Sequence, residues 1–242
     1  SILLGFSQAN QQFYRYAAAD NVSINLKSKA ISLVLAGGLI AAILGPEVSR
    51  YSFDFFPDYI YLATYLFAAL IQIINFLILI FIKIKKPVLS KKSYRPLSVI
   101  LLQKNLIIAI LAGAVGYSLM SFIMTATPLQ IVNVCKLGDS ASATVIQWHV
   151  IAMFAPSFFT GTIINSLGNR KVMMIGLFLY AFSISFTIIG QTIEHFWTAL
   201  FLCGLGWNFL YVGGSDIIAK SALPEERAKV QGVTDFIIFV FV

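Results

Sequence analysis

Long apolar segments dominate the sequence, and each is about as long as a helix that crosses a lipid bilayer. Such a helix needs about 20 consecutive, mainly apolar residues. Eight segments of this kind occur, near residues 3–19, 30–46, 59–82, 106–131, 143–163, 172–189, 196–218 and 230–242. The composition agrees, because 59% of the 242 residues are hydrophobic and only 11% are charged. The sequence therefore predicts an all-α, polytopic membrane protein.

Positive charges are concentrated in alternate connections between these segments. The connections after the first, third, fifth and seventh segments hold most of the 17 Lys and Arg, among them Lys27, Lys29, Lys83, Lys104, Arg170, Lys171, Arg227 and Lys229. The connections on the opposite side contain Arg50 and Lys136. Because cytoplasmic loops carry an excess of Lys and Arg, we predict that the first group faces the cytoplasm. The net charge of +7 then reflects topology, and we expect no nucleic-acid partner.

The longest basic connection runs from Lys83 to Lys104, and we interpret it as a linker between two helical bundles. The predicted division has residues 1–82 as the end of an N-terminal bundle, 83–105 as a basic cytoplasmic linker and 106–242 as a C-terminal bundle. The chain starts without an initiator Met and ends within an apolar run. We therefore expect a fragment that is truncated at both ends.

Polar residues recur in every third segment, which indicates a repeated three-helix unit. The first, fourth and seventh segments hold most of the polar side chains, whereas the third and sixth have no charged residue. In addition, Asp20 and Asp216 are each followed by a pair of cations and a new apolar run. Both copies descend to the same side, as in transporters that are built from parallel repeats.

A short turn joins the fifth and sixth segments and contains Gly161, Gly168, Arg170 and Lys171. Together with the three-helix repeats and the long basic linker, this turn resembles the cytoplasmic signature of the major facilitator superfamily. The fold of that family consists of two six-helix bundles, and the chain would correspond to its fourth to eleventh helices. Asn165 stands where the signature has an acidic residue, so the resemblance implies a weaker or absent charge lock here.

The resemblance implies a secondary active transporter that moves a small molecule across the bacterial inner membrane as a multi-pass monomer. It implies no enzyme activity, metal or cofactor. We favour proton-coupled export, with proton-coupled metabolite uptake and a non-transport membrane protein as the alternatives. Export is favoured because the second segment has a small-residue face, at Gly37, Gly38, Ala41, Gly45 and Pro46, that is similar to the family's antiporter signature, with Ala41 in place of one of its glycines. Close helix packing through small residues is the alternative explanation of that face.

Ionisable residues within the apolar segments are candidates for a substrate or proton pathway, because a charge at the bilayer centre costs about 2.5–3.5 kcal/mol on insertion scales. Arg15 either contributes to a substrate or gating site or serves as a structural anchor, for which Asp20 is one partner. Asp216 and Asp235 are the candidate proton carriers, although Asp216 is also placed to cap its helix or face water. His149 is a candidate proton relay, or else a hydrogen-bonded interior histidine.

The fourth and seventh segments contain the remaining candidates for substrate contact, with ordinary packing as the alternative. They are Tyr117, Thr125, Thr127, Trp207 and Asn208. Pro128 lacks a backbone N–H, so we expect it to break its helix near the outer end and to form part of a gate. The predicted conformational turns further include Pro156, Gly161, Gly168, Arg170 and Lys171.

The sequence shows no catalytic or metal-binding pattern of the kind that depends on short spacing. His149 and His195 are too far apart to form a metal motif. Cys135 is predicted in an outside connection and Cys203 within a segment, so we expect no disulfide between them.

Overall fold

The computed structural model describes residues 9–52, 54–82, 95–223 and 225–242. Within these ranges the regular structure is helical, as predicted. The α-helices are α2 (Tyr14–Asp20), α3 (Lys27–Ala36), α4 (Gly38–Ser52), α5 (Leu62–Phe81), α6 (Leu97–Leu101), α7 (Lys104–Leu129), α8 (Asp139–Phe154), α9 (Ser157–Leu167), α10 (Asn169–Ile189), α11 (Ile193–Ser221) and α12 (Arg227–Val240). A short 3₁₀-helix, Ile24–Leu26, precedes α3, and a π-helix, Gln130–Val134, follows α7.

Five helical stretches are long and apolar enough to cross a membrane: Ile24–Ser52, Leu62–Phe81, Lys104–Val134, Asn169–Ile189 and Ile193–Ser221. The bent pair α8 and α9 makes a sixth if it is counted as one span. These stretches coincide with the six predicted middle segments. The predicted first and last segments correspond to the shorter helices α2 and α12, and residues 1–8 lie outside the described residues.

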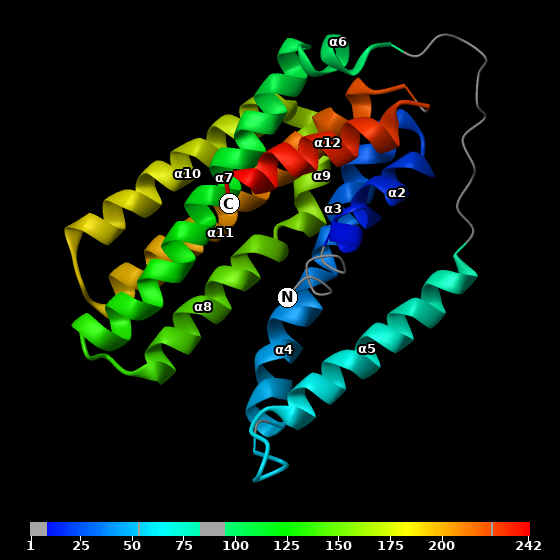
Figure 1. The fold of residues 1–242 in the computed structure, drawn as a ribbon. Helices are drawn as coiled ribbons and strands as arrows, with labels where there is room; N and C mark the ends of the chain where they lie inside the picture. Colours follow the sequence, from blue (N-terminus) through cyan, green and yellow to red (C-terminus); the bar gives the residue numbers. More distant parts are fainter. Residues whose placement is uncertain (1–8, 53, 83–94, 224) are drawn as a thin grey trace.

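The described residues of the predicted basic connections lie toward one end of the molecule, where Figure 1 shows α6, the start of α7 and the start of α12. The turn between α4 and α5 and the turn between α7 and α8 lie at the opposite end (Figure 1). This arrangement agrees with the alternation of inside and outside connections predicted from the charges.

Helix α11 lies among the C-terminal helices and packs against α7, α8 and α10. The contact with α10 is close because Gly176 and Gly206 face each other. A Cβ atom added to Gly206 would lie 2.9 Å from the carbonyl oxygen of Gly176. Two clusters of buried apolar side chains surround α11, one toward the basic end of the molecule and one around Trp207 and Tyr211.

The N-terminal helices α2 to α4 pack against the C-terminal bundle. Helix α3 lies along α9 and α11, and α4 contacts α8. Gly38 permits the latter contact, because a Cβ atom there would lie 2.6 Å from the Phe154 ring. By contrast, Gly45 and Pro46 are exposed, and a Cβ atom at Gly45 would meet nothing within 4 Å. Of the predicted linker, residues 83–94 lie outside the described residues, and the remainder contains α6 and the start of α7.

Two prolines have different effects on their helices. The predicted break at Pro128 is wrong, since α7 continues through this residue to Leu129. The helix then changes to the π-helix Gln130–Val134, and the Gln130 N–H reaches the carbonyl oxygens of both Ala126 and Thr127. The sharp bend lies instead at Pro156, where α8 and α9 meet at 42°.

Candidate functional site

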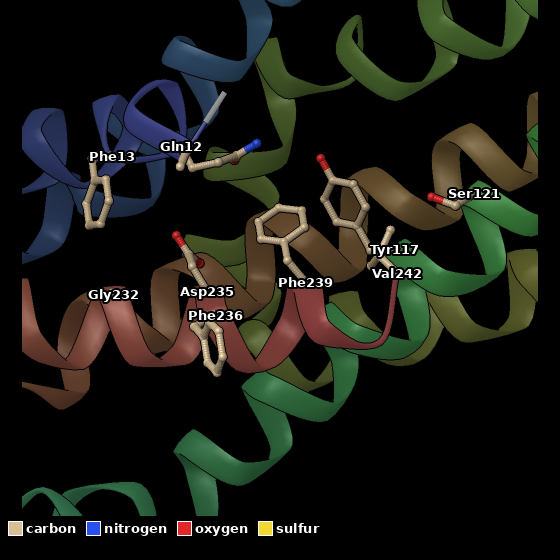
Figure 2. A pocket seen from close by; sticks show the side chains of 10 residues that line it. Gln12, Phe13, Tyr117, Ser121, Gly232, Asp235, Phe236, Phe239 and Val242 are labelled. Carbon is tan, nitrogen blue, oxygen red and sulfur yellow. The ribbon is translucent and has the colours of Figure 1, made fainter. Parts of the chain in front are cut away.

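A cavity of about 580 Å³ lies between α7, α12 and residues 9–13, which directly precede α2 (Figure 2). Its lining is largely aromatic and apolar, with a few polar groups: Ala9, Gln12, Phe13, Tyr117, Ser121, Gly232, Asp235, Phe236, Phe239 and Val242. In Figure 2 the side chains of Gln12, Tyr117, Asp235 and Phe239 face a shared space. An apolar pocket of this size with a few convergent polar groups is typical of small-molecule sites, which occupy about 300–1,000 Å³.

An ion pair joins the two ends of the chain at the wall of this cavity. Arg15 Nη2 lies 2.8 Å from Asp235 Oδ1 and 3.1 Å from Asp235 Oδ2. Arg15 is only 2% exposed and Asp235 7%. The partner expected for Arg15, Asp20, is not used. A buried charge requires a partner, and Asp235 supplies one from α12.

Aromatic rings enclose the Arg15 guanidinium on both sides. Its carbon Cζ lies 4.3 Å from the ring centre of Tyr16 and 4.6 Å from that of Tyr211, which are cation–π distances. The Tyr16 hydroxyl accepts from Arg15 Nη2 at 3.0 Å and lies 3.4 Å from Asp235 Oδ1. Gln12 completes the arrangement, because its Oε1 accepts from both Arg15 Nη1 and the Tyr211 hydroxyl. The ion pair is therefore held in one geometry from several directions.

Tyr117 connects the cavity to the aromatic centre of the C-terminal bundle. Its ring makes edge contacts with Trp207, Tyr211 and Phe239 at centroid distances of 5.5, 5.3 and 4.9 Å. Trp207 in turn stacks on Tyr211 at 4.7 Å. Trp207 is buried behind Tyr117 and does not line the cavity itself. A ligand that contacts Tyr117 would therefore touch a rigid aromatic cluster.

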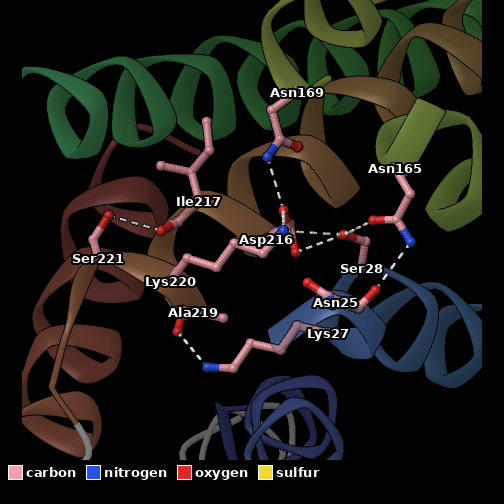
Figure 3. Close-up of polar contacts among 10 residues, drawn as sticks. All are labelled: Asn25, Lys27, Ser28, Asn165, Asn169, Asp216, Ile217, Ala219, Lys220 and Ser221. Atoms are coloured by element: carbon pink, nitrogen blue, oxygen red, sulfur yellow. Dashed lines mark hydrogen bonds and ion pairs between the residues drawn. The ribbon is translucent and has the colours of Figure 1, made fainter. Parts of the chain in front are cut away.

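A second polar cluster lies at the basic end of the molecule and is centred on Asp216 (Figure 3). The Asp216 carboxylate is fully buried. Its Oδ2 accepts from Asn169 Nδ2 at 2.7 Å and from Lys220 Nζ at 2.6 Å, and its Oδ1 lies 2.8 Å from Ser28 Oγ. We call Asp216, Ser28, Asn169 and Lys220 the inner cluster. It joins α3 of the N-terminal part to α10 and α11 of the C-terminal part. Asp216 therefore makes buried hydrogen bonds, whereas the sequence also allowed a residue that caps its helix or faces water.

The predicted turn residues lie beside the inner cluster. Gly161 allows α9 to approach the start of α3, because a Cβ atom there would lie 2.6 Å from the carbonyl oxygen of Ser28. Asn165, which stands at the acidic position of the signature, donates to the carbonyl oxygen of Asn25 at 3.1 Å. Gly168 has φ +84°, a conformation that favours glycine. Asp216 thus supplies, from α11, a carboxylate that the turn itself lacks.

The other charged candidates lie at the same basic end. Asp20 accepts from Arg227 Nη1 at 2.8 Å and lies 3.9 Å from Lys27 Nζ. Arg170 Nη2 donates to Asn105 Oδ1 at 3.1 Å, and Lys171 is exposed.

The remaining candidates lie apart from the cavity. His149 is fully buried between α8 and α11, where its Nδ1 lies 2.7 Å from the carbonyl oxygen of Leu200. Asn208 is also fully buried, and its Nδ2 donates to the Met153 carbonyl oxygen at 2.7 Å and to Ser157 Oγ at 2.6 Å. Its amide therefore braces the bend at Pro156. Thr127 is buried and Thr125 exposed, and neither lines the cavity.

Sequence reasoning missed several residues of both polar sites. Tyr16, Ser28, Gln12 and Tyr211 are not among the predicted site residues. A signal existed for Gln12, because it lies three residues before Arg15 and so shares its helix face. Ser28 has no such signal, since its partner Asp216 is 188 residues away.

Within the described residues, no three His, Cys, Asp or Glu side chains gather closely enough to hold a metal ion. Cys135 and Cys203 are both free thiols. The chemistry that the two polar sites offer is thus hydrogen bonding, aromatic contact and the pairing or release of buried charges.

Comparison with known proteins places these features in a family. The sequence model described as Major Facilitator Superfamily matches residues 1–241. The chain is 39% identical to the riboflavin transporter RfnT of Brucella anthropi over 243 residues, which cover 99% of this chain and 61% of that protein. It is 26% identical to the uncharacterised MFS-type transporter YddS of Bacillus subtilis over 269 residues, which cover 98% of this chain and 58% of that protein.

A third relative matches a shorter part of the chain. The uncharacterised MFS-type transporter YdeG of Bacillus subtilis is 34% identical over 141 residues, which cover 56% of this chain and 32% of that protein. The chain therefore spans roughly three fifths of the length of the two relatives that match along nearly all of it.

Proposed function

Because the chain belongs to the major facilitator superfamily, we propose that it forms the substrate-binding part of a secondary active transporter that works by alternating access. It is a multi-pass membrane protein, and we propose the bacterial inner membrane as its location and a monomer as its working form. The observation that supports transport best is the aromatic cavity, whose wall is closed by an ion pair between the N-terminal and C-terminal parts. We propose no catalytic activity.

The substrate of this proposal is riboflavin or a closely related small molecule. A protein with 39% identity along nearly the whole chain carries the name riboflavin transporter. Tyr117, Phe239 and Phe13 offer aromatic surface at the cavity, which suits the flat ring system of a flavin. Gln12 and Ser121 add neutral hydrogen-bonding groups. The cavity volume of about 580 Å³ is within the range of small-molecule sites.

In the proposed transport cycle, the contacts within the two polar sites break and form again. The inner cluster ties α3 to α10 and α11 at the basic end, so its separation would open that end. The Arg15–Asp235 pair ties α2 to α12 beside the cavity. Protonation of either carboxylate removes the charge that its cation neutralises, which couples proton binding to the loosening of that contact. Asp235 and Asp216 are therefore our proposed proton carriers.

Export remains our proposed direction, based on the small-residue face at Gly37, Gly38, Gly45 and Pro46. Proton-coupled uptake is the alternative, and the same assay separates the two. Purified full-length protein is reconstituted into liposomes, and riboflavin flux is followed under pH gradients of either sign. We expect flux that follows the gradient, with Asp235→Asn and Asp216→Asn both uncoupling or slowing it.

Asp139→Asn serves as the matched control, because Asp139 is exposed at the opposite end of the molecule. It should transport as the unmodified protein does. Flux that ignores the pH gradient and tolerates both buried substitutions would refute proton coupling. An absence of riboflavin flux in either direction would refute the proposed substrate.

A further inference from the structure

Among the described residues that line the cavity, Asp235 is the one that carries a charge. No described Lys, Arg or His lines the cavity. The charge of Asp235 is cancelled by Arg15, whose Nη2 contacts both carboxylate oxygens at 2.8 and 3.1 Å. The wall that a ligand meets is therefore polar in places but carries no net charge.

Arg15 is poorly placed to serve a ligand in addition to Asp235. The residue is 2% exposed, and its guanidinium is covered by the rings of Tyr16 and Tyr211 at 4.3 and 4.6 Å. Nη1 donates to Gln12, and Nη2 is taken up by Asp235 and Tyr16. An anionic group on a ligand would have to displace Asp235 from this enclosure to gain a cation. It would then leave that carboxylate buried and unpaired, which is costly.

The groups that do face the cavity are neutral. The Oε1 atom of Gln12 accepts two hydrogen bonds within the wall, from Arg15 and from Tyr211. The carboxamide is thereby fixed in one orientation, and Figure 2 shows its nitrogen on the cavity side. The hydroxyls of Tyr117 and Ser121 line the same space. Such groups match the carbonyl oxygens and ring nitrogens of an uncharged heterocycle.

We propose that the cavity selects an uncharged, planar aromatic molecule and discriminates against anionic derivatives of the same ring, with Arg15 and Asp235 as the positioning pair that keeps the wall neutral. This inference rests on the proposed function for its choice of ligand, but it concerns charge selectivity and not movement. Riboflavin is an uncharged ligand of this kind, and flavin mononucleotide is an anionic derivative with the same ring system.

Substitution of Asp235 and substitution of Arg15 should therefore change the charge preference of the cavity in opposite directions. Asp235→Asn leaves the Arg15 cation uncompensated, so the wall becomes positive and tolerates an anion. Arg15→Gln leaves the Asp235 carboxylate, so the wall becomes negative and rejects an anion more strongly. The double variant removes both charges and restores a neutral wall. Opposite effects of the two single variants, together with recovery in the double variant, would distinguish a change of charge balance from a general loss of structure.

The test is equilibrium binding of riboflavin, its ring analogue lumichrome and flavin mononucleotide to the purified full-length protein in detergent. We expect the unmodified protein to bind flavin mononucleotide about tenfold or more weakly than riboflavin, since a phosphate that leaves water for a neutral wall gains no counter-charge. In Asp235→Asn the ratio of the two dissociation constants should fall by about tenfold, and in Arg15→Gln it should rise. The double variant and the exposed control Asp139→Asn should both keep the original preference for the uncharged ligand.

Three results would overturn the proposal. They are equal or tighter binding of flavin mononucleotide by the unmodified protein, a ratio that Asp235→Asn leaves unchanged, and binding of neither riboflavin nor lumichrome. The outcome is separable from that of the flux assay. Riboflavin flux without charge preference refutes the selectivity alone, whereas binding with the expected preference but without flux refutes the transporter alone.

Discussion

Arg15 Nη2 lies 2.8 Å from Asp235 Oδ1, although 220 residues separate the two in the chain. This contact connects α2 with α12, the first and last helices that the structure describes in full, beside the cavity. Both side chains are buried, so neither charge can be exchanged for water without rearrangement. The pair therefore serves as a structural tie and as the charge balance of the site.

Loss of one member of this pair should destabilise the protein more than loss of both. Removing one partner of a buried ion pair leaves an unpaired charge and costs about 3–5 kcal/mol, whereas replacing both leaves no charge without a partner. We expect Arg15→Gln and Asp235→Asn each to lower the unfolding free energy, and the double variant to recover most of the loss. Denaturation in detergent measures this double-mutant cycle. Additive single effects would show that the two charges do not interact.

Gly161→Ala should destabilise the contact between α9 and α3. The new methyl group would lie 2.6 Å from the Ser28 carbonyl oxygen and 2.7 Å from Lys29 Cα, both of which are backbone atoms that cannot rotate away. Overpacking of this kind costs about 1–3 kcal/mol. Gly45→Ala is the matched control within a helix, because its methyl group would meet nothing within 4 Å. Thermal unfolding in detergent should show a lower midpoint for Gly161→Ala only, and equal midpoints would refute the close packing.

Asp216→Asn should loosen the basic end of the molecule. The substitution removes the charge that Lys220 neutralises and weakens the acceptor for Ser28 and Asn169. Ser32 lies one turn beyond Ser28 on α3 and is 2% exposed, so the thiol of a Ser32→Cys variant reports opening of this end. In a background with Cys135 and Cys203 replaced by Ser, we expect Asp216→Asn to raise the rate of maleimide labelling several-fold. Ser166→Ala, at an exposed site, is the control. An unchanged rate would mean that the inner cluster does not hold α3 in place.

The Arg95–Glu226 pair lies outside the membrane-spanning segments. It should make the stability of the protein depend on pH. Arg95 Nε lies 2.9 Å from Glu226 Oε1, and this hydrogen bond lowers the pKa of Glu226 from 4.5 to about 2. A lowered carboxyl pKa stabilises the folded state above the ordinary value, and that contribution disappears as the pH falls toward about 2. Glu226→Gln should therefore destabilise the protein at pH 7 and progressively less below about pH 4.5.

The comparison of unfolding midpoints at pH 7, 5, 4 and 3 tests this dependence. Glu47→Gln is the control, because Glu47 pairs with Arg50 in an exposed position near the end of α4. It should change stability little at any of these pH values. A difference between Glu226→Gln and the unmodified protein that stays constant from pH 7 to pH 3 would contradict the lowered pKa.

Much of the fold was predictable because it depends on local properties of the sequence. Segment length and hydropathy identified the membrane helices, and the turn with Gly161, Gly168, Arg170 and Lys171 identified the superfamily that the comparisons confirm. The effect of Pro128 was mispredicted, since α7 continues through it to Leu129 and changes to a π-helix only afterwards. The residue types around Pro128 do not indicate such a change of helix type.

The candidate sites were predictable in part. Arg15, Asp235 and Asp216 stood out as charges within apolar segments, for which burial demands partners. The partners themselves depend on which helices meet, and that information is not local. Asp20 was only one possible partner predicted for Arg15, and the fold instead pairs Arg15 with Asp235 and Asp20 with Arg227. Asn208 was expected beside a substrate but braces the bend at Pro156, which only the packing of α8 against α11 reveals.

We propose that this chain carries the site of an alternating-access transporter for an uncharged aromatic molecule. The most direct test is counterflow in liposomes that contain the full-length protein and are preloaded with unlabelled riboflavin. External radiolabelled riboflavin at trace concentration should accumulate inside transiently and then decline, and the overshoot should be weaker in Asp235→Asn. A slow, monotonic entry of label that matches protein-free liposomes would contradict the account.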